Sequence, residues 1–225
     1  MDKIIYAFWT EDNELTARRK TNLEILKSKC GTELKFLNYN EIPNYELPDH
    51  KFHKAYKYLS ATHKSDYLRT YFMHFYGGGY CDIKRAEWDW NEQFDFLNQS
   101  DYWITGYRLR GITDLAVSPA DINSNLIRDN WNLILGYGAM ICKPNTPFTK
   151  YWFDLMTDIL DKKIDQLKEN PAMHVRDRTG WRGTNSNYPL SWAEIGPEIF
   201  MKSCYTYKDK LCYQLPCPHL DEKYR

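Results

Sequence analysis

Charged residues between positions 66 and 84 carry the clearest chemical signal in this sequence. Asp66 and Arg69 are three residues apart, so on a helix their carboxylate and guanidinium share one face. A run of three glycines at 77–79 follows, and glycine lets a backbone turn sharply or approach a ligand closely. A short stretch then leads to Asp82 and Lys84. A charged helix face that runs into such a turn can assemble a site for a nucleotide-linked sugar.

One helix and one strand have to position these groups. Apolar side chains recur at three- and four-residue steps, which predicts a helix over residues 60–76 with a separate polar stripe. The glycine run ends this helix, and residues 80–83 begin a strand. The polar stripe and Asp82 can therefore converge where the strand ends.

The remaining pattern is that of an α/β protein. The opening reads strand, helix, strand, which is typical of the first half of an α/β nucleotide-binding fold. Thr10 or Asp12 is expected to cap its helix. Further along, the polar and basic stretch at 170–189 is predicted to be a loop. Its Arg176, Arg178 and Arg182 either are solvated or belong to a lid over the donor phosphates. The expected strands are 3–9, 33–37, 80–83, 102–106 and 137–142, the expected helices are 10–28, 60–76, 91–98, 148–167 and most of 191–207, and residues 107–130 are expected to be irregular.

Length and composition further limit the classes of protein that this sequence can encode. The 225 residues suit one domain over 1–225, and 30 basic against 30 acidic residues leave no whole-chain field for nucleic acid or an anionic membrane. No stretch is long enough to span a bilayer. The six cysteines lack Cys-x-x-Cys spacing, which favours reduced thiols in a cytoplasmic compartment. The spacing of Cys204, Cys212, Cys217 and His219 fits no common zinc site. Aromatic residues make up 16% of the chain, which is compatible with stacking on sugars and bases.

The stretch around the glycines resembles the core of the DXD-type sugar transferases. This family includes capsular-polysaccharide glycosyltransferases, initiating mannosyltransferases and glucosylating toxin domains. Weaker similarity is visible at residues 4–9, 138–140 and 196–197. One position departs from the pattern, because Lys84 stands where the family has its second Asp, giving Asp-Ile-Lys. The positions in register are Asp66, Arg69, Tyr76, Gly77, Gly78, Tyr80 and Asp82.

The resemblance implies a GT-A-type fold, with a mixed, mainly parallel sheet flanked by helices and the donor at the strand ends. It implies that Asp82 contacts the donor, and that Asp66 and Arg69 bind sugar hydroxyls and the phosphate side. Trp9 matches an aromatic residue that flanks the base, although a place in the core fits it equally well. The implied donor-binding set is Phe8, Trp9, Thr10, Asp66, Arg69, Gly78, Asp82 and Lys84, with Arg69, Asp82 and Lys84 as the catalytic subset.

Lys84 changes the expectation about metal. In the resembled family the second Asp holds a divalent cation, whereas an ammonium at this position would repel a dication. The same ammonium can pair with a diphosphate, so we expect no obligate metal. The alternative is Mn²⁺ or Mg²⁺ held by Asp82 with a distant ligand such as His219.

The expected activity is transfer of a hexose-type sugar from a UDP- or GDP-linked donor to a hydroxyl of a glycan or small molecule, in polysaccharide or glycan synthesis. The resemblance implies retention of configuration without a dedicated base; an inverting enzyme would need a carboxylate such as Asp114, Asp177 or Glu194. Two alternatives stay open: a non-catalytic module that binds sugar nucleotides or glycans, and a sugar nucleotidyltransferase. Asp66 and Arg69 taken alone also fit an ordinary helix ion pair. Nothing in the sequence indicates an oligomeric state.

Overall fold

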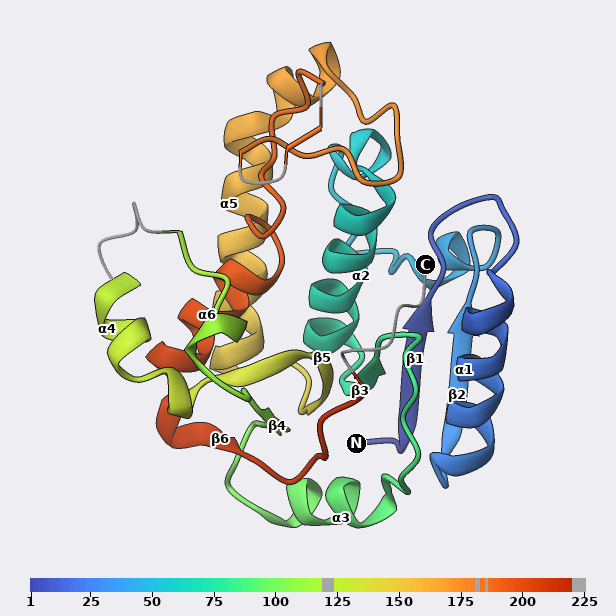
Figure 1. Ribbon diagram of the computed structural model, residues 1–225, viewed down its shortest axis with the longest axis vertical. Helices are drawn as coiled ribbons and strands as arrows, with labels where there is room; N and C mark the ends of the chain where they lie inside the picture. The colour runs from blue at the N-terminus through green and yellow to red at the C-terminus, as the bar shows by residue number, and fades with distance from the viewer. Residues whose placement is uncertain (119–123, 181–182, 185, 220–225) are drawn as a thin grey trace.

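The fold is built on a mixed sheet with the strand order β2-β1-β3-β5-β4-β6 (Figure 1). The computed structural model describes residues 1–118, 124–180, 183–184 and 186–219. Within them β1 pairs in parallel with β2 and β3, and β4 with β6, while β5 runs antiparallel to β3 and β4. The predicted mixed, mainly parallel α/β architecture is therefore confirmed. The strands are β1 Ile4–Phe8, β2 Glu33–Leu37, β3 Gly78–Cys81, β4 Ile104–Arg108, β5 Leu135–Cys142 and β6 Leu211–Cys212.

Helices cover both faces of this sheet. Side chains of α2, α5 and α6 build the larger apolar core, which includes Phe72, Trp152 and Phe200. Side chains of α1 and α3 build a second core on the other face, around Leu26 and Phe94. No helix in these described stretches is long and apolar enough to cross a membrane. The helices are α1 Ala17–Lys29, α2 Ala61–Phe75, α3 Asn91–Gln99, α4 Ser124–Asp129, α5 Pro147–Glu169 and α6 Pro197–Thr206.

Helix α2 and strand β3 form where the pattern predicts them, with one shift at the glycines. The Ser60 side chain caps α2 by accepting a hydrogen bond from the backbone N–H of His63. Gly77, with φ 66°, then reverses the chain. The strand begins at Gly78, earlier than predicted, because a Cβ there would lie 2.7 Å from the Ile4 carbonyl oxygen of β1. Only glycine permits this approach of two strands.

Two helix starts differ from the prediction. Helix α1 begins at Ala17 with Thr16 as its cap, because the side chains before it bond elsewhere. The Trp9 indole N–H donates to the Asn13 carbonyl at 2.7 Å, and the Thr10 hydroxyl donates to the Ala61 carbonyl at 2.8 Å. Helix α6 begins only at Pro197, since Gly196 before it has ψ −110° and cannot continue a helix.

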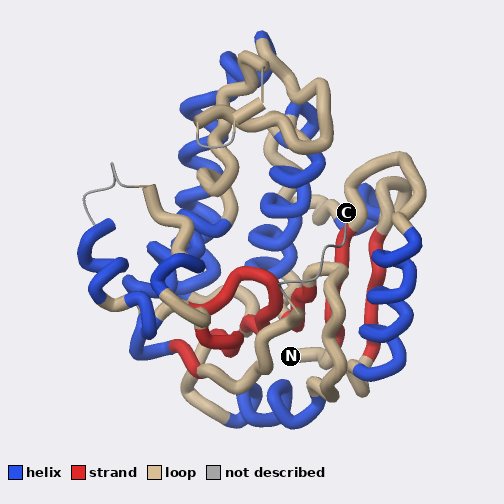
Figure 2. The backbone as a smooth tube through the Cα atoms, viewed as in Figure 1, coloured by secondary structure: helices blue, strands red, loops and turns tan. Residues whose placement is uncertain are grey.

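Of two connecting segments predicted to be irregular, one contains a helix and the other is a loop. The segment 107–130 is not wholly irregular, because it holds the short helix α4. The described residues of the long connection between α5 and α6 form a loop, as predicted, and this loop passes over the first turn of α2 (Figure 2). There the Thr62 backbone N–H donates to the Val175 carbonyl at 3.2 Å. Arg182 lies outside the described residues.

Candidate active site

Four charged side chains meet at the carboxyl end of β3, between the sheet and α2. Arg69 Nη1 lies 3.3 Å from Asp66 Oδ1, and Arg69 Nη2 lies 3.0 Å from Asp82 Oδ1. Lys84 Nζ lies 2.8 Å from the other Asp82 oxygen, Oδ2. Tyr80 accepts a hydrogen bond from Arg69 Nη2 and donates one to Asp82 Oδ1, both at 2.7 Å. We call Asp66, Arg69, Asp82 and Lys84 the charged cluster.

The fold brings the charged cluster together in a simple way. Asp66 and Arg69 lie one helical turn apart on α2, which descends beside the sheet. Strand β3 returns parallel to β1, so Asp82 emerges at the same sheet edge as Trp9 and Thr10. The backbone N–H of Asp82 donates to the Gly138 carbonyl of β5 at 2.8 Å, which fixes the strand end.

Burial and neighbouring charges give the carboxyl groups of Asp66 and Asp82 very different pKa values. Burial raises the pKa of Asp66 from 3.8 to about 7; Arg69 opposes this rise and Asp82 adds to it. Burial would also raise the pKa of Asp82, but the Lys84 ammonium and the Arg69 guanidinium outweigh it and lower that pKa to about 2. Asp82 is therefore an anion at neutral pH, whereas Asp66 exchanges a proton there.

Tyr137 of β5 is a site residue that the sequence analysis missed. The Arg69 guanidinium lies between two aromatic rings, with its carbon 3.7 Å from the centre of the Tyr137 ring and 4.2 Å from that of Tyr80. The Tyr137 ring also packs against Trp152 of α5 and Phe200 of α6. A guanidinium held between two rings keeps a fixed direction, so Tyr137 orients Arg69. Its neighbours in sequence, the weak match at 138–140, were the only signal available.

Two glycines allow the chain to approach the carboxylates. A Cβ at Gly196 would lie 2.5 Å from Asp66 Oδ2, and a Cβ at Gly138 would lie 3.2 Å from Asp82 Oδ2. Both positions belong to the segments in which the sequence shows only weak family similarity. The absence of a side chain at these two glycines therefore leaves room for the carboxylates of the charged cluster.

The other predicted donor-binding residues have different surroundings. Phe8 is 6% exposed, and its ring packs against Phe72 and Tyr80 in the core. Trp9 is half-buried at the end of β1, with the Arg19 guanidinium 5.0 Å from its ring centre. Thr10 is buried and joins β1 to α2. Gly78 is buried at the opposite end of β3 from Asp82, against β1.

The carboxylates considered for an inverting reaction are bound to other groups. Asp114 pairs with Arg110, and Glu194 pairs with Lys163 at 2.6 Å. Asp177 is buried and accepts hydrogen bonds from the backbone N–H groups of residues 173 and 174.

Asp82 and His219 are the two residues that the sequence analysis named as ligands of an alternative metal ion. Such a cation prefers several anionic or carbonyl oxygens, whereas both oxygens of Asp82 already face positively charged groups. His219 is half-exposed, and its Nε2 lies 4.0 Å from Glu87. Among the described residues, no group of three His, Cys, Asp or Glu side chains is placed to hold a metal ion.

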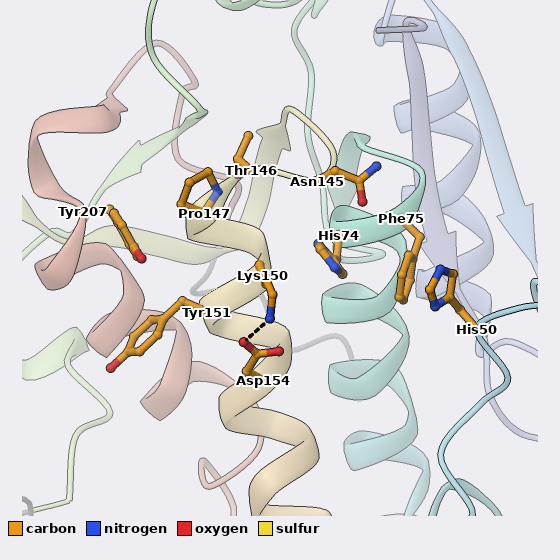
Figure 3. Close-up of a pocket in the computed structure, with 10 residues that line it drawn as sticks. All are labelled: His50, His74, Phe75, Asn145, Thr146, Pro147, Lys150, Tyr151, Asp154 and Tyr207. Atoms are coloured by element: carbon orange, nitrogen blue, oxygen red, sulfur yellow. Dashed lines mark hydrogen bonds and ion pairs between the residues drawn. The ribbon is translucent and has the colours of Figure 1, made fainter.

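A cavity of about 580 Å³ lies away from the charged cluster, at the other end of α2 (Figure 3). His74 and Phe75 of α2 line it, together with residues at the start of α5. The cavity contains none of the four cluster residues. We place the candidate active site at the charged cluster because its ionisable side chains converge there at the carboxyl end of β3.

Comparisons with known proteins give little further information. No family model matches the chain, and no curated protein sequence matches it. Among solved structures, the chain is similar to one titled "PaToxG Glycosyltransferase", with 12% sequence identity and a TM-score of 0.48. The alignment covers 91% of this chain and 69% of that one. Similarity at this level does not assign the chain to a family.

Proposed function

We propose that residues 1–225 form one GT-A-type glycosyltransferase domain, which moves a hexose-type sugar from a UDP- or GDP-linked donor to a hydroxyl of a glycan or small molecule. The observation that carries this proposal is the convergence of Asp66, Arg69, Asp82 and Lys84 at the carboxyl ends of parallel strands. In open α/β sheets, ligands bind at that edge.

Each charged group has a task in this proposal. Breaking the bond between the anomeric carbon and the phosphate oxygen leaves a diphosphate whose negative charge grows in the transition state. Lys84 and Arg69 supply the positive charge that stabilises it. Asp82 accepts hydrogen bonds from donor hydroxyls, and Asp66 binds sugar hydroxyls beside it. Trp9, at the end of β1, flanks the base. The acceptor oxygen then bonds to the anomeric carbon, and its proton passes to the leaving diphosphate, so the reaction retains configuration and uses no dedicated base.

Transfer without an obligate metal is part of the proposal. It is supported by the two cationic side chains that lie 3.0 Å and 2.8 Å from the oxygens of Asp82, because they would repel a dication bound there. Mn²⁺ or Mg²⁺ bound through Asp82 and His219 is the opposing arrangement.

The test is release of sugar and nucleotide from a panel of UDP- and GDP-sugars, with and without EDTA. We expect hydrolysis of at least one donor in EDTA, and loss of hydrolysis in Asp82→Ala and Lys84→Gln. Asp95→Asn and Lys27→Gln, at exposed sites away from the charged cluster, are the matched controls. Donor breakdown that requires Mn²⁺ would refute metal independence, and activity that survives Asp82→Ala would refute the site.

A non-catalytic module that binds sugar nucleotides is the second candidate, because Lys84 replaces an Asp of the resembled motif. The same panel separates the two functions. A module would raise its melting temperature with a donor but release no free sugar. Release of pyrophosphate from UTP or GTP mixed with a sugar 1-phosphate, in a separate assay, would instead indicate a nucleotidyltransferase.

A further inference from the structure

The cavity at the far end of α2 has the character of a second binding site. It spans the last turn of α2 and the first turns of α5, with Tyr207 after α6 at its far side, and we call it the α2–α5 groove. Arg69, the nearest cluster member on α2, is five residues from His74, which corresponds to about 7.5 Å along the helix axis. None of the four cluster residues lines the groove. The groove is therefore separate from the charged cluster. Its volume of about 580 Å³ falls within the usual range for small-ligand sites.

Aromatic rings stand on both sides of the groove (Figure 3). On one side the His50 ring stacks on Phe75, with centres 4.4 Å apart and planes inclined by 23°. On the other side Tyr151 meets Tyr207 edge to face at 5.9 Å. Ring faces with polar tips suit the C–H faces and hydroxyl edges of pyranose sugars.

The polar groups between these rings carry no net charge. Lys150 and Asp154 neutralise each other at 2.6 Å. His74 is uncharged at neutral pH, because burial lowers its pKa to about 4, against an upward pull from Asp154. Its Nδ1 lies 3.2 Å from the Thr149 hydroxyl, and its Nε2 has no hydrogen-bond partner within the described part of the chain. The exposed side-chain amide of Asn145 adds donors and an acceptor at the rim.

We propose that the α2–α5 groove binds a neutral glycan, with sugar rings against the aromatic walls and hydroxyls on Asn145, His74 and the Lys150–Asp154 pair. A phosphorylated or acidic ligand would find no uncompensated cation among the side chains that form this groove. This proposal does not depend on the reaction at the charged cluster, since a glycan can bind here whether or not sugar is transferred there.

Asn145 offers a variant with little cost to the fold. It is the one non-glycine residue with positive φ in the described segments, at 53°. Asn145→Gly therefore keeps the backbone conformation while removing the amide. Tyr151→Ala removes one aromatic wall, and Tyr39→Ala is the matched control, since Tyr39 is 48% exposed elsewhere on the surface.

The experiment is titration of the full chain with neutral oligosaccharides (maltohexaose, cellohexaose, tetra-N-acetylchitotetraose and an α-mannotetraose), followed by isothermal calorimetry and saturation-transfer NMR. We expect at least one to bind, with affinity about tenfold weaker in Tyr151→Ala and several-fold weaker in Asn145→Gly, and unchanged in Tyr39→Ala. Failure of all four to bind the wild-type chain would overturn the proposal. Binding that both groove variants retain in full would overturn it as well, because the glycan would then sit elsewhere.

Discussion

The buried Asp66 carboxyl should make the protein less stable at alkaline than at acidic pH, and Asp66→Asn should remove this effect. The pKa of this group is about 7 in the folded chain against 3.8 for an ordinary Asp. A carboxyl whose pKa rises on folding gives full stability below its unfolded pKa, and that stability is lost as pH rises through the folded pKa. The amide of Asn copies the neutral acid and cannot ionise.

The size of the effect follows from these two pKa values. At about 1.4 kcal/mol per pKa unit, the raised pKa of Asp66 costs about 4 kcal/mol of stability at pH 8, where the carboxyl is ionised in both states. It costs about 2 kcal/mol at pH 5, where the folded chain keeps a proton that the unfolded chain has released. Asp66→Asn should therefore raise the free energy of unfolding by about 2–3 kcal/mol more at pH 8 than at pH 5. Urea denaturation followed by tryptophan fluorescence at both pH values measures this difference. Asp12→Asn, at an exposed position, is the control.

Loss of the same amount of stability at both pH values in Asp66→Asn would refute this prediction. That result would mean that Asp66 is ionised throughout, held by Arg69 as a structural ion pair. Stabilisation at pH 8 combined with loss of donor binding would instead support a carboxyl kept buried for function, at a cost to the fold.

Three further predictions concern the surroundings of the charged cluster. Lys84→Asp restores a pair of carboxylates with Asp82, so Mn²⁺ alone should bind at least about tenfold more tightly in calorimetry than to the wild-type chain; equal affinity would contradict the role given to the lysine. Tyr137→Leu removes a ring from Arg69 and should cost about 2 kcal/mol of unfolding free energy, whereas Tyr137→Phe should cost less than half of that; equal costs in urea denaturation would show that the ring contact is unimportant. Gly196→Ala brings a Cβ to 2.5 Å from the Asp66 carboxylate and should cost about 1–3 kcal/mol; the cost should fall in an Asp66→Ala background, and an unchanged cost would rule out this contact.

Local patterns in the sequence predict the elements whose determinants lie close together in the chain. Strand β2 has the predicted bounds, and α2 begins after the Ser60 cap and ends before the glycine run. The predictions fail where a residue far away in the sequence determines the local structure. Helix α1 starts late because Thr10 bonds to Ala61, far along the chain, and Gly78 enters the strand because of the Ile4 carbonyl.

The same distinction applies to the candidate site. Asp66, Arg69 and Asp82 were identified because they lie in one short stretch with recognisable spacing. Tyr137 and Gly196 contact this stretch only after β5 and α6 have packed against it, and no spacing in the sequence relates them to Arg69 or Asp66. Both residues act through their size: the Tyr137 ring covers the Arg69 guanidinium, and Gly196 leaves space beside the Asp66 carboxylate.

The charges of the cluster explain why a lysine can stand at position 84. Asp82 carries one negative charge, and Arg69 and Lys84 lie 3.0 Å and 2.8 Å from its two oxygens. If Asp66 holds a proton, the cluster has one net positive charge; a carboxylate at position 84 in place of the ammonium would make it net negative and would demand a bound cation before any diphosphate could approach. The lysine supplies that positive charge from the chain itself, and it does so without the coordination geometry that a dication requires. The departure from the DXD pattern and the proposed metal-free chemistry therefore have a common physical basis.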